Sequence, residues 1–296
     1  MIDLSIIIVS YNGKDFVRDC LSSIKQTISK NITYEIIMVD NDSSDGTADM
    51  VAKEFSSVVL LRNTNEGFAK ANNRGVKVAK GKYILFLNPD TVVYEQTIEG
   101  MLQFVQEHPD CGAATCKLEM LSGDIDYASH RGFPTPWNSF CYFSGLTKLF
   151  PHVKLFSGYT LGYKSLRTIH EIDALAGAFM LLPRTAGEDV GWWDEDYYFN
   201  GEDIDFCFRL KKKGWKIYYV PTYKILHYNG ISGGTKAHSS EMTTATKETK
   251  LRIQNARFDA MKIFYKKHYT EKYPRFITSL IFWAIEKKRK KTIGSL

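Results

Sequence analysis

Short apolar runs alternate with amphipathic stretches through the first 120 residues. Four runs rich in Ile, Val and Leu are predicted to be strands, at residues 4–9, 34–39, 58–62 and 83–87. Between the first two runs, apolar residues recur at helical spacing at Phe16, Val17, Cys20, Leu21 and Ile24. A second helix is predicted at 68–80, ending at Gly81. This alternation is typical of βα units and predicts an α/β fold with a mostly parallel sheet flanked by helices.

The pattern is less regular after residue 120. Segment 120–170 is rich in Gly, Pro and aromatic residues, and we interpret it as an excursion over the sheet, with a lid over the site as an alternative. Further strands are predicted at 172–175, 179–183 and 216–220, a helix at 206–213, and a long amphipathic helix at 239–268. We therefore predict an α/β domain over 1–235 and a helical C-terminal extension over 236–296.

Composition and charge exclude several classes of protein. The 296 residues are 44% hydrophobic and 24% charged, which is ordinary for a globular protein. Segment 286–291 supplies +4 of the formal charge of +6, so the rest of the chain lacks the positive field of a nucleic-acid-binding protein. Five Cys without a C-x-x-C pair indicate free thiols rather than disulfides or zinc. No secretory signal begins the chain, and these features together predict a cytoplasmic protein.

A polar loop follows each of the four predicted N-terminal strands. These loops lie at 10–13, 40–47, 63–67 and 88–91. In an open parallel sheet they share the edge at the carboxyl ends of the strands, where ligands bind. The chain has neither a G-x-G-x-x-G motif after the first strand nor a P-loop, which argues against a dinucleotide oxidoreductase and a P-loop ATPase.

Three sets of residues in or after these loops could carry chemistry. Asn88 and Asp90 offer oxygen ligands for a divalent cation, although Asn-Pro-Asp also favours a plain turn. The acidic segment 201–205 opens a predicted helix, so its carboxylates are candidates for a general base or for helix capping. His227 ends another apolar run, and we interpret it either as a metal ligand or as a structural or surface residue.

The order of these segments resembles a known family. The segments that carry the resemblance are 5–12, 39–47, 65–75, 87–90 and 201–210 with His227. Together they resemble the family 2 inverting glycosyltransferases of the GT-A fold, in the rhamnosyltransferase-like branch. The resemblance covers roughly residues 3–235 and rests on the combination rather than on any single motif.

The resemblance implies a nucleotide-sugar site with a bound cation. Tyr11 would stack on the base and Asp40 would hydrogen-bond its edge. The whole set of donor-binding residues that it implies is Tyr11, Asn12, Asp40, Asp42, Asn73, Arg74, Asn88 and Asp90. Mg²⁺ or Mn²⁺ would be held by Asp90 and His227, with Asn88 as a further ligand. Asn88 stands where many relatives have the first Asp of an Asp-x-Asp motif, which puts strict metal dependence in doubt.

The resemblance also implies how the transfer reaction would proceed. Asp203 would be the general base that takes the proton from the acceptor hydroxyl, and one displacement would invert the anomeric configuration. Glu202 and Trp193 would orient the acceptor, with capping and core packing as alternatives. We expect transfer of a sugar, such as L-rhamnose from dTDP-rhamnose, to a cell-surface or lipid-linked glycan. The alternatives are a UDP- or GDP-sugar donor, or a non-catalytic binding module.

The C-terminal extension has a membrane-related interpretation. The apolar run 276–285 is about half the roughly 20 residues that span a bilayer, and five basic residues at 287–291 follow it closely. It is predicted either to lie on the anionic cytoplasmic face of the plasma membrane or to pack as a helix with a solvated end.

Overall fold

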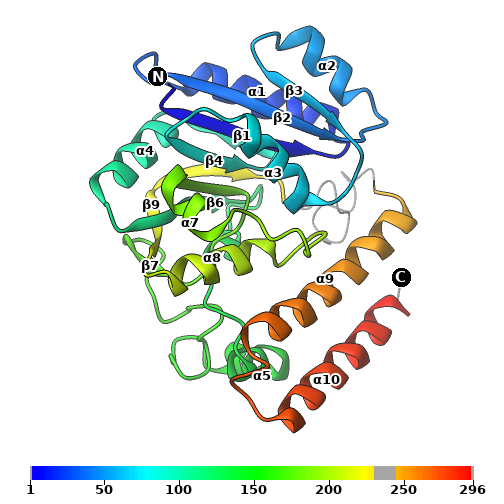
Figure 1. Ribbon diagram of the computed structural model, residues 1–296. Coiled ribbons are helices and arrows are strands. Elements are labelled where there is room, and N and C mark those ends of the chain that lie inside the picture. Colours follow the sequence, from blue (N-terminus) through cyan, green and yellow to red (C-terminus); the bar gives the residue numbers. More distant parts are fainter. Residues whose placement is uncertain (1, 230–244, 295–296) are drawn as a thin grey trace.

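A mixed, mostly parallel sheet forms the centre of the protein (Figure 1). The computed structural model describes residues 2–229 and 245–294. The sheet has the strand order β3-β2-β1-β4-β8-β6-β9-β5, and β7 pairs with β9. The strands are β1 Leu4–Ser10, β2 Tyr34–Asn41, β3 Val59–Asn63, β4 Tyr83–Leu87, β5 Thr91–Val93, β6 Cys111–Glu119, β7 His170–Ile172, β8 Phe179–Pro183 and β9 Lys216–His227. The helices are α1 Lys14–Thr27, α2 Thr47–Glu54, α3 Phe68–Val78, α4 Thr97–Glu107, η1 Tyr127–Ser129, α5 Pro136–Ser144, α6 Leu146–Leu149, α7 Arg184–Val190, α8 Glu202–Lys212, α9 Lys247–His268 and α10 Arg275–Ile293.

The four N-terminal strands confirm the βα prediction. β1 pairs in parallel with both β2 and β4, and β2 pairs in parallel with β3. Every residue of β1 is buried, as expected for a strand that helices cover on both faces. β6 was not predicted, because its Gly, Ala, Thr and Cys residues lack the Ile and Val signal of the other strands.

Two apolar clusters fill the two faces of the sheet. One cluster contains Leu4, Ile6 and Ile8 of β1 together with residues of α1 and α4. The other contains Ile7 of the same strand with residues of α3, α7 and α8. Alternate residues of β1 therefore anchor opposite helical layers, which fixes where each strand ends relative to the helices.

Antiparallel strand β8 determines which segments meet at the ligand edge. It pairs with β4 so that Leu87 lies opposite Phe179. The carboxyl end of β4 and the segment preceding β8 therefore lie at the same edge of the sheet. The four polar loops and residues 173–178 are gathered there.

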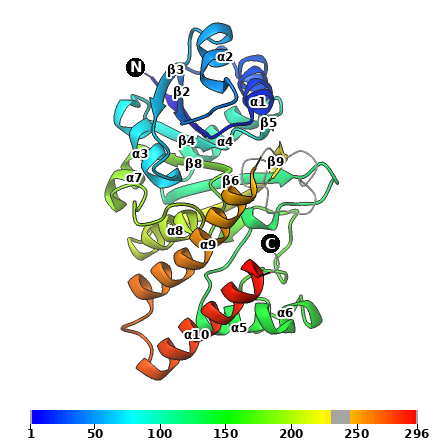
Figure 2. The ribbon, with the colours of Figure 1, turned by 90° about the vertical axis from the view of Figure 1, so that its right-hand side faces the viewer.

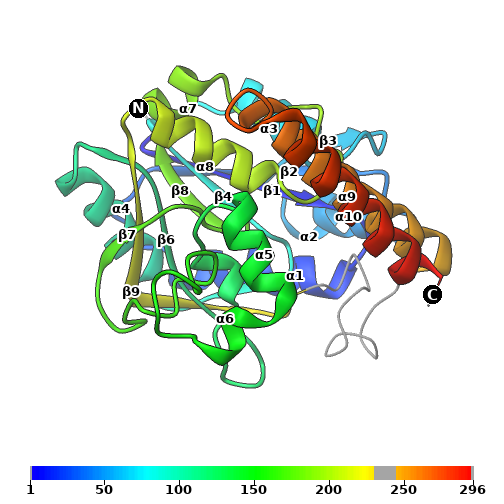
Figure 3. The same ribbon diagram turned by 90° about the horizontal axis from the view of Figure 1, so that it is seen from below.

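The C-terminal helices lie side by side against this body (Figure 3). α9 packs on α8, with the rings of Phe208 and Phe264 5.6 Å apart. α10 packs on α9, with the rings of Tyr265 and Phe282 5.7 Å apart. The helix predicted at 239–268 is confirmed over α9, while residues 239–244 lie outside the described residues. Across 2–229 and 245–294, no helix has both the length and the apolar character that crossing a bilayer requires.

Candidate active site

Asp40 lies at the end of β2 with one carboxylate oxygen unused. The residue is 4% exposed, and its Oδ2 accepts a hydrogen bond of 3.1 Å from the Ser43 backbone. Its Oδ1 is buried and has no hydrogen-bond partner in the described part of the chain. A buried acceptor without a partner is costly, so this oxygen is suited to an N–H group of a ligand such as a nucleotide base.

Tyr11 lies opposite a cation from the C-terminal extension. The guanidinium of Arg252 on α9 lies 5.8 Å from the ring centre of Tyr11 and 5.6 Å from that of Tyr198. A cavity of about 440 Å³ lies between the β1 and β2 loops and the start of α9, lined by Tyr11, Asn12, Ser44, Asp45, Ala245, Thr246, Glu248, Thr249 and Arg252. Arg252 was not predicted to be a site residue, because it lies outside the motifs.

Asn12 and Asp42 have conformations that shape the loops. Asn12 has a φ of 59° and Asp42 a φ of 72°, both in the left-handed region that Asn and Asp tolerate. The Asn12 side chain accepts a 2.9 Å hydrogen bond from the Ser44 backbone, and its own N–H donates to Ser43 Oγ at 2.8 Å. Asn12 therefore joins the first two polar loops, whereas Asp42 is exposed at their surface.

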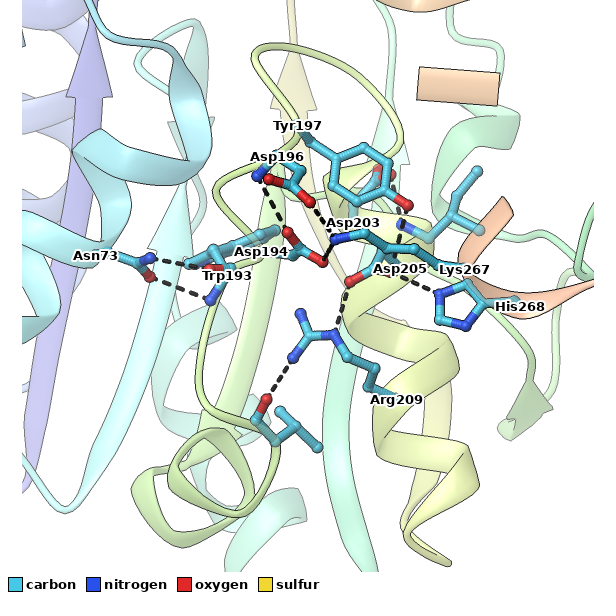
Figure 4. A network of polar contacts seen from close by, with 12 residues as sticks. Asn73, Trp193, Asp194, Asp196, Tyr197, Asp203, Asp205, Arg209, Lys267 and His268 are labelled. Carbon is cyan, nitrogen blue, oxygen red and sulfur yellow. Dashed lines mark hydrogen bonds and ion pairs between the residues drawn. The ribbon is translucent and has the colours of Figure 1, made fainter. Parts of the chain in front are cut away.

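Asn73, Arg74 and Trp193 have partners within the protein. The Asn73 side chain donates to the Trp193 carbonyl at 2.9 Å and accepts from its N–H at 3.1 Å (Figure 4). Arg74 pairs with Glu66 and Asn63. Trp193 is 2% exposed and packs in the core, which favours core packing over contact with an acceptor.

Asp90 and His227 meet where β5 pairs with β9. His227 Nε2 lies 3.4 Å from Asp90 Oδ1, and its Nδ1 lies 3.1 Å from Asp126 Oδ2. Burial disfavours the charged imidazole, but the two carboxylates outweigh burial and raise the pKa of His227 to about 9. The Asn88 side chain, which is partly exposed, projects from the same loop.

These residues fit a divalent cation that also binds a diphosphate. No cluster of three or more His, Cys, Asp or Glu side chains suited to a metal occurs within 2–229 and 245–294. Asp90 and His227 could nevertheless supply two ligands, because Mg²⁺ and Mn²⁺ at such sites take the rest from phosphate and water. Asp126 hydrogen-bonds Nδ1 of His227, the ring nitrogen that does not face Asp90, and such a carboxylate fixes the orientation of a metal-binding histidine. No local pattern indicates Asp126, because it lies 101 positions from His227 along the chain.

Asp203 lies in the first turn of α8, after Gly201, whose φ is +85°. Its Oδ2 accepts a 2.7 Å hydrogen bond from Arg131, and its Oδ1 accepts one of 2.7 Å from the Ile204 backbone. A carboxylate has about four acceptor positions, so Asp203 keeps capacity for an acceptor hydroxyl. Arg131 was not predicted to be a site residue, because it lies in the irregular segment.

Asp90 and Asp203 connect to the same short segment before β8. Arg131, the partner of Asp203, also donates to the Leu175 carbonyl at 3.0 Å. Asn88, two residues before Asp90, donates through its backbone to the Ala178 carbonyl at 3.1 Å. Residues 175–178 therefore link the loop of the metal-site candidates to the partner of the candidate base.

The carboxylates next to Asp203 have different environments. Glu202 is 7% exposed, and burial together with Asp203 raises its pKa. Asp205 is fully buried between Arg209 at 2.6 Å and His268 at 2.7 Å (Figure 4). Burial opposes its charge, but His268 and Arg209 lower its pKa, so Asp205 anchors α9 on α8.

Comparisons with known proteins agree with this architecture. Rhamnosyltransferase WbbL of Escherichia coli (strain K12) is 26% identical over 231 residues, which are 75% of this chain and 82% of that protein. An N-acetylglucosaminyl-diphospho-decaprenol L-rhamnosyltransferase of Mycobacterium tuberculosis is 25% identical over 246 residues, covering 78% of both chains. A poly-beta-1,6-N-acetyl-D-glucosamine synthase of Staphylococcus aureus is 27% identical over 74% of this chain and 48% of that protein.

A solved structure shares the fold. The mannosyltransferase PcManGT of Pyrobaculum calidifontis, in complex with GDP-Man and Mn²⁺, matches with a TM-score of 0.59 at 15% identity, over 98% of this chain and 72% of that one. The expected GT-A fold is therefore confirmed. The sequence model of "Glycosyl transferase family 2" matches residues 5–165, more than half of the chain. The chain belongs to glycosyl transferase family 2 and is a glycosyltransferase.

Proposed function

We propose that this enzyme transfers L-rhamnose from dTDP-rhamnose, with inversion, to a growing cell-surface or lipid-linked glycan. The observation that carries the proposal is the link through residues 175–178 between the Asp90 loop and the Arg131–Asp203 pair. The naming of two relatives as rhamnosyltransferases supports the choice of sugar. We further propose that the enzyme acts at the cytoplasmic face of the membrane, where a lipid-linked acceptor would be presented.

The chain's own residues would divide the work between donor and acceptor. The unpaired oxygen of Asp40 would accept the ring N–H of the base, while Tyr11 and Arg252 would bracket the nucleotide. Asp90 and His227 would hold Mg²⁺ or Mn²⁺, which would neutralise the departing diphosphate. Asp203 would take the proton of the acceptor hydroxyl, and Arg131 would fix the orientation of its carboxylate.

Replacement of Asp203 by Asn tests this assignment. We expect Asp203→Asn to lose on the order of 10²–10⁴ in transfer rate while donor affinity stays close to wild type, because the base acts on the acceptor. Asp196→Asn is a matched control, since Asp196 lies in the same acidic stretch but is a surface residue that pairs with Lys267. Wild-type turnover by Asp203→Asn would contradict the assignment.

One observation supports a different sugar donor as the alternative. The match to poly-beta-1,6-N-acetyl-D-glucosamine synthases suggests an N-acetylglucosamine donor as the alternative. Asp40 does not separate the two, because thymine and uracil offer the same ring N–H. Thermal shift with dTDP-rhamnose, UDP-N-acetylglucosamine and GDP-mannose, each with and without Mn²⁺, distinguishes them, since the true donor raises the melting temperature most.

A further inference from the structure

The exposed large hydrophobic side chains are concentrated in two segments that are far apart in the sequence. Among the described residues, eight of them lie within 137–155, on α5, α6 and the loop that follows, namely Trp137, Phe140, Tyr142, Phe143, Leu149, Phe150, Val153 and Leu155. Three more lie on α10, namely Phe276, Leu280 and Trp283. A large exposed apolar patch of this kind marks a surface that binds a protein, a membrane or another ligand. We call these eleven side chains the aromatic surface.

The two segments adjoin in space. Lys288 of α10 places its ammonium 3.9 Å from the ring centre of Phe143 on α5. Figure 2 shows α10 beside α5 and α6, on the side of the molecule away from β3. The aromatic surface therefore continues from the irregular segment onto the C-terminal helix.

The apolar stripe of α10 faces away from the rest of the protein. Phe276, Leu280 and Trp283 are 72%, 60% and 59% exposed, at spacings of four and three residues, so they share one side of the helix. The opposite side contacts α9, through Phe282 on Tyr265 and through the ion pair of Glu286 with Lys262. Packing on the body therefore accounts for one side of α10 and leaves the apolar side without a partner in the described chain.

Both segments carry positive charge and almost no negative charge. Residues 137–155 contain two Lys, Lys148 and Lys154, and no Asp or Glu. Residues 275–294 contain six Lys or Arg and only Glu286 as an acid. Lys287 lies in line with the apolar stripe of α10 and places its ammonium 5.0 Å from the Trp283 ring centre. Aromatic and aliphatic side chains bordered by lysines are typical of surfaces that rest on anionic lipid.

We propose that the aromatic surface docks the enzyme on an anionic lipid bilayer through α5–α6 and α10 together. The proposal deepens the membrane location given under the proposed function, and it assigns eight of the eleven contacting side chains to a segment inside the glycosyltransferase domain. Lipid is favoured over a second copy of the chain because two such faces would bring like charges together.

The same segment connects the aromatic surface to the candidate base. Arg131, which holds Asp203, lies five residues before α5, and the Gly132 backbone donates to Tyr159 at 2.8 Å. Docking through α5–α6 would therefore place the bilayer beside the acceptor side of the site. An acceptor with a lipid anchor could then reach Asp203 without leaving the membrane.

Vesicle co-sedimentation of the full chain tests the proposal. One set of vesicles contains phosphatidylcholine alone, and the other contains equal parts of phosphatidylcholine and phosphatidylglycerol. Two variants remove apolar side chains that are already exposed, Phe140→Ser/Leu149→Ser/Leu155→Ser on one segment and Phe276→Ser/Leu280→Ser/Trp283→Ser on the other. Val59→Ser/Val78→Ser is the control, because these exposed residues lie on β3 and α3.

We expect wild type and control to bind the anionic vesicles and to release them at high salt. Each triple variant should bind at least about tenfold more weakly, since three buried apolar side chains are lost from the contact. Wild-type affinity in the α5–α6 variant, or equal binding to both vesicle types, would overturn the proposal. So would a stable dimer whose formation requires the same residues.

Donor-induced thermal shift separates this proposal from the proposed function. The triple variants should keep the wild-type shift, because the donor cavity lies on other elements. An enzyme that binds vesicles but no nucleotide sugar would contradict the proposed function and leave the docking surface intact.

Discussion

The buried ion pairs of Asp205 give the most quantitative prediction. Asp205 is 0% exposed and joins three elements, through Arg209 on α8, His268 on α9 and the Tyr197 hydroxyl at 3.3 Å. Asp205→Asn keeps the shape but removes the charge, so at least one charge-assisted hydrogen bond is lost and Arg209, which is only partly exposed, is left without its counter-charge. Such bonds contribute about 1.5–3 kcal/mol each, and broken buried pairs cost about 3–5 kcal/mol.

We therefore expect Asp205→Asn to lower the free energy of unfolding by about 2–4 kcal/mol at pH 7, measured by urea denaturation. The control is Asp49→Asn, which breaks a surface ion pair with Arg62. The side chains of Asp49 and Arg62 are 81% and 58% exposed, so this change should cost at most about 1 kcal/mol. The pKa of Asp205 is lowered in the folded protein. Its contribution should therefore be present above the unfolded pKa of about 3.9 and should fade as the pH falls through the folded value. A loss equal to that of the control would refute the idea that Asp205 anchors α9.

Four further predictions follow from the site. Glu202→Gln should gain stability relative to wild type as the pH rises above about 4.3, because the raised pKa of Glu202 makes its ionisation costly in the folded state. Urea midpoints of both proteins measured across pH test this, and a constant difference between the two midpoints would contradict it. Trp193→Ala should cost about 3–5 kcal/mol in urea unfolding, whereas a residue that only touches the acceptor would leave stability unchanged. Asp126→Asn should weaken Mn²⁺ binding about 10–100-fold in calorimetry with a nucleoside diphosphate present, with the exposed Asp124→Asn as control. Arg252→Ala should reduce the donor-induced thermal shift, and an unchanged shift would remove Arg252 from the donor site.

Periodicity and strand-end chemistry were sufficient to predict the N-terminal half of the fold. Runs of Ile, Val and Leu locate β1 to β4. In β1 and β4 the reason is burial, because parallel strands covered by helices need such residues on both faces. β6 escaped prediction because its small residues carry no such signal. Its burial depends on strands β8 and β9, which are distant in the sequence.

The site was predicted as motifs but not as contacts. Asp40, Asp90 and Asp203 follow or precede recognisable elements, so their neighbourhoods could be inferred. Arg131 and Asp126 lie in the irregular segment and meet Asp203 and His227 only through the tertiary fold. The roles of Asn73 and Trp193 also depend on a contact between residues 120 positions apart, which no local pattern indicates.

We propose that a cation at Asp90 and a general base at Asp203 act in one transfer reaction, the cation on the donor diphosphate and the base on the acceptor hydroxyl. A crystal structure with a nucleoside diphosphate and Mn²⁺ tests it most directly. We expect Mn²⁺ on Asp90 and His227, the nucleobase against Tyr11 and Asp40, and the Asp203 carboxylate facing the open side of the diphosphate. A diphosphate bound elsewhere, or an Asp203 side chain turned away from it, would rule out a shared active site for Asp90 and Asp203.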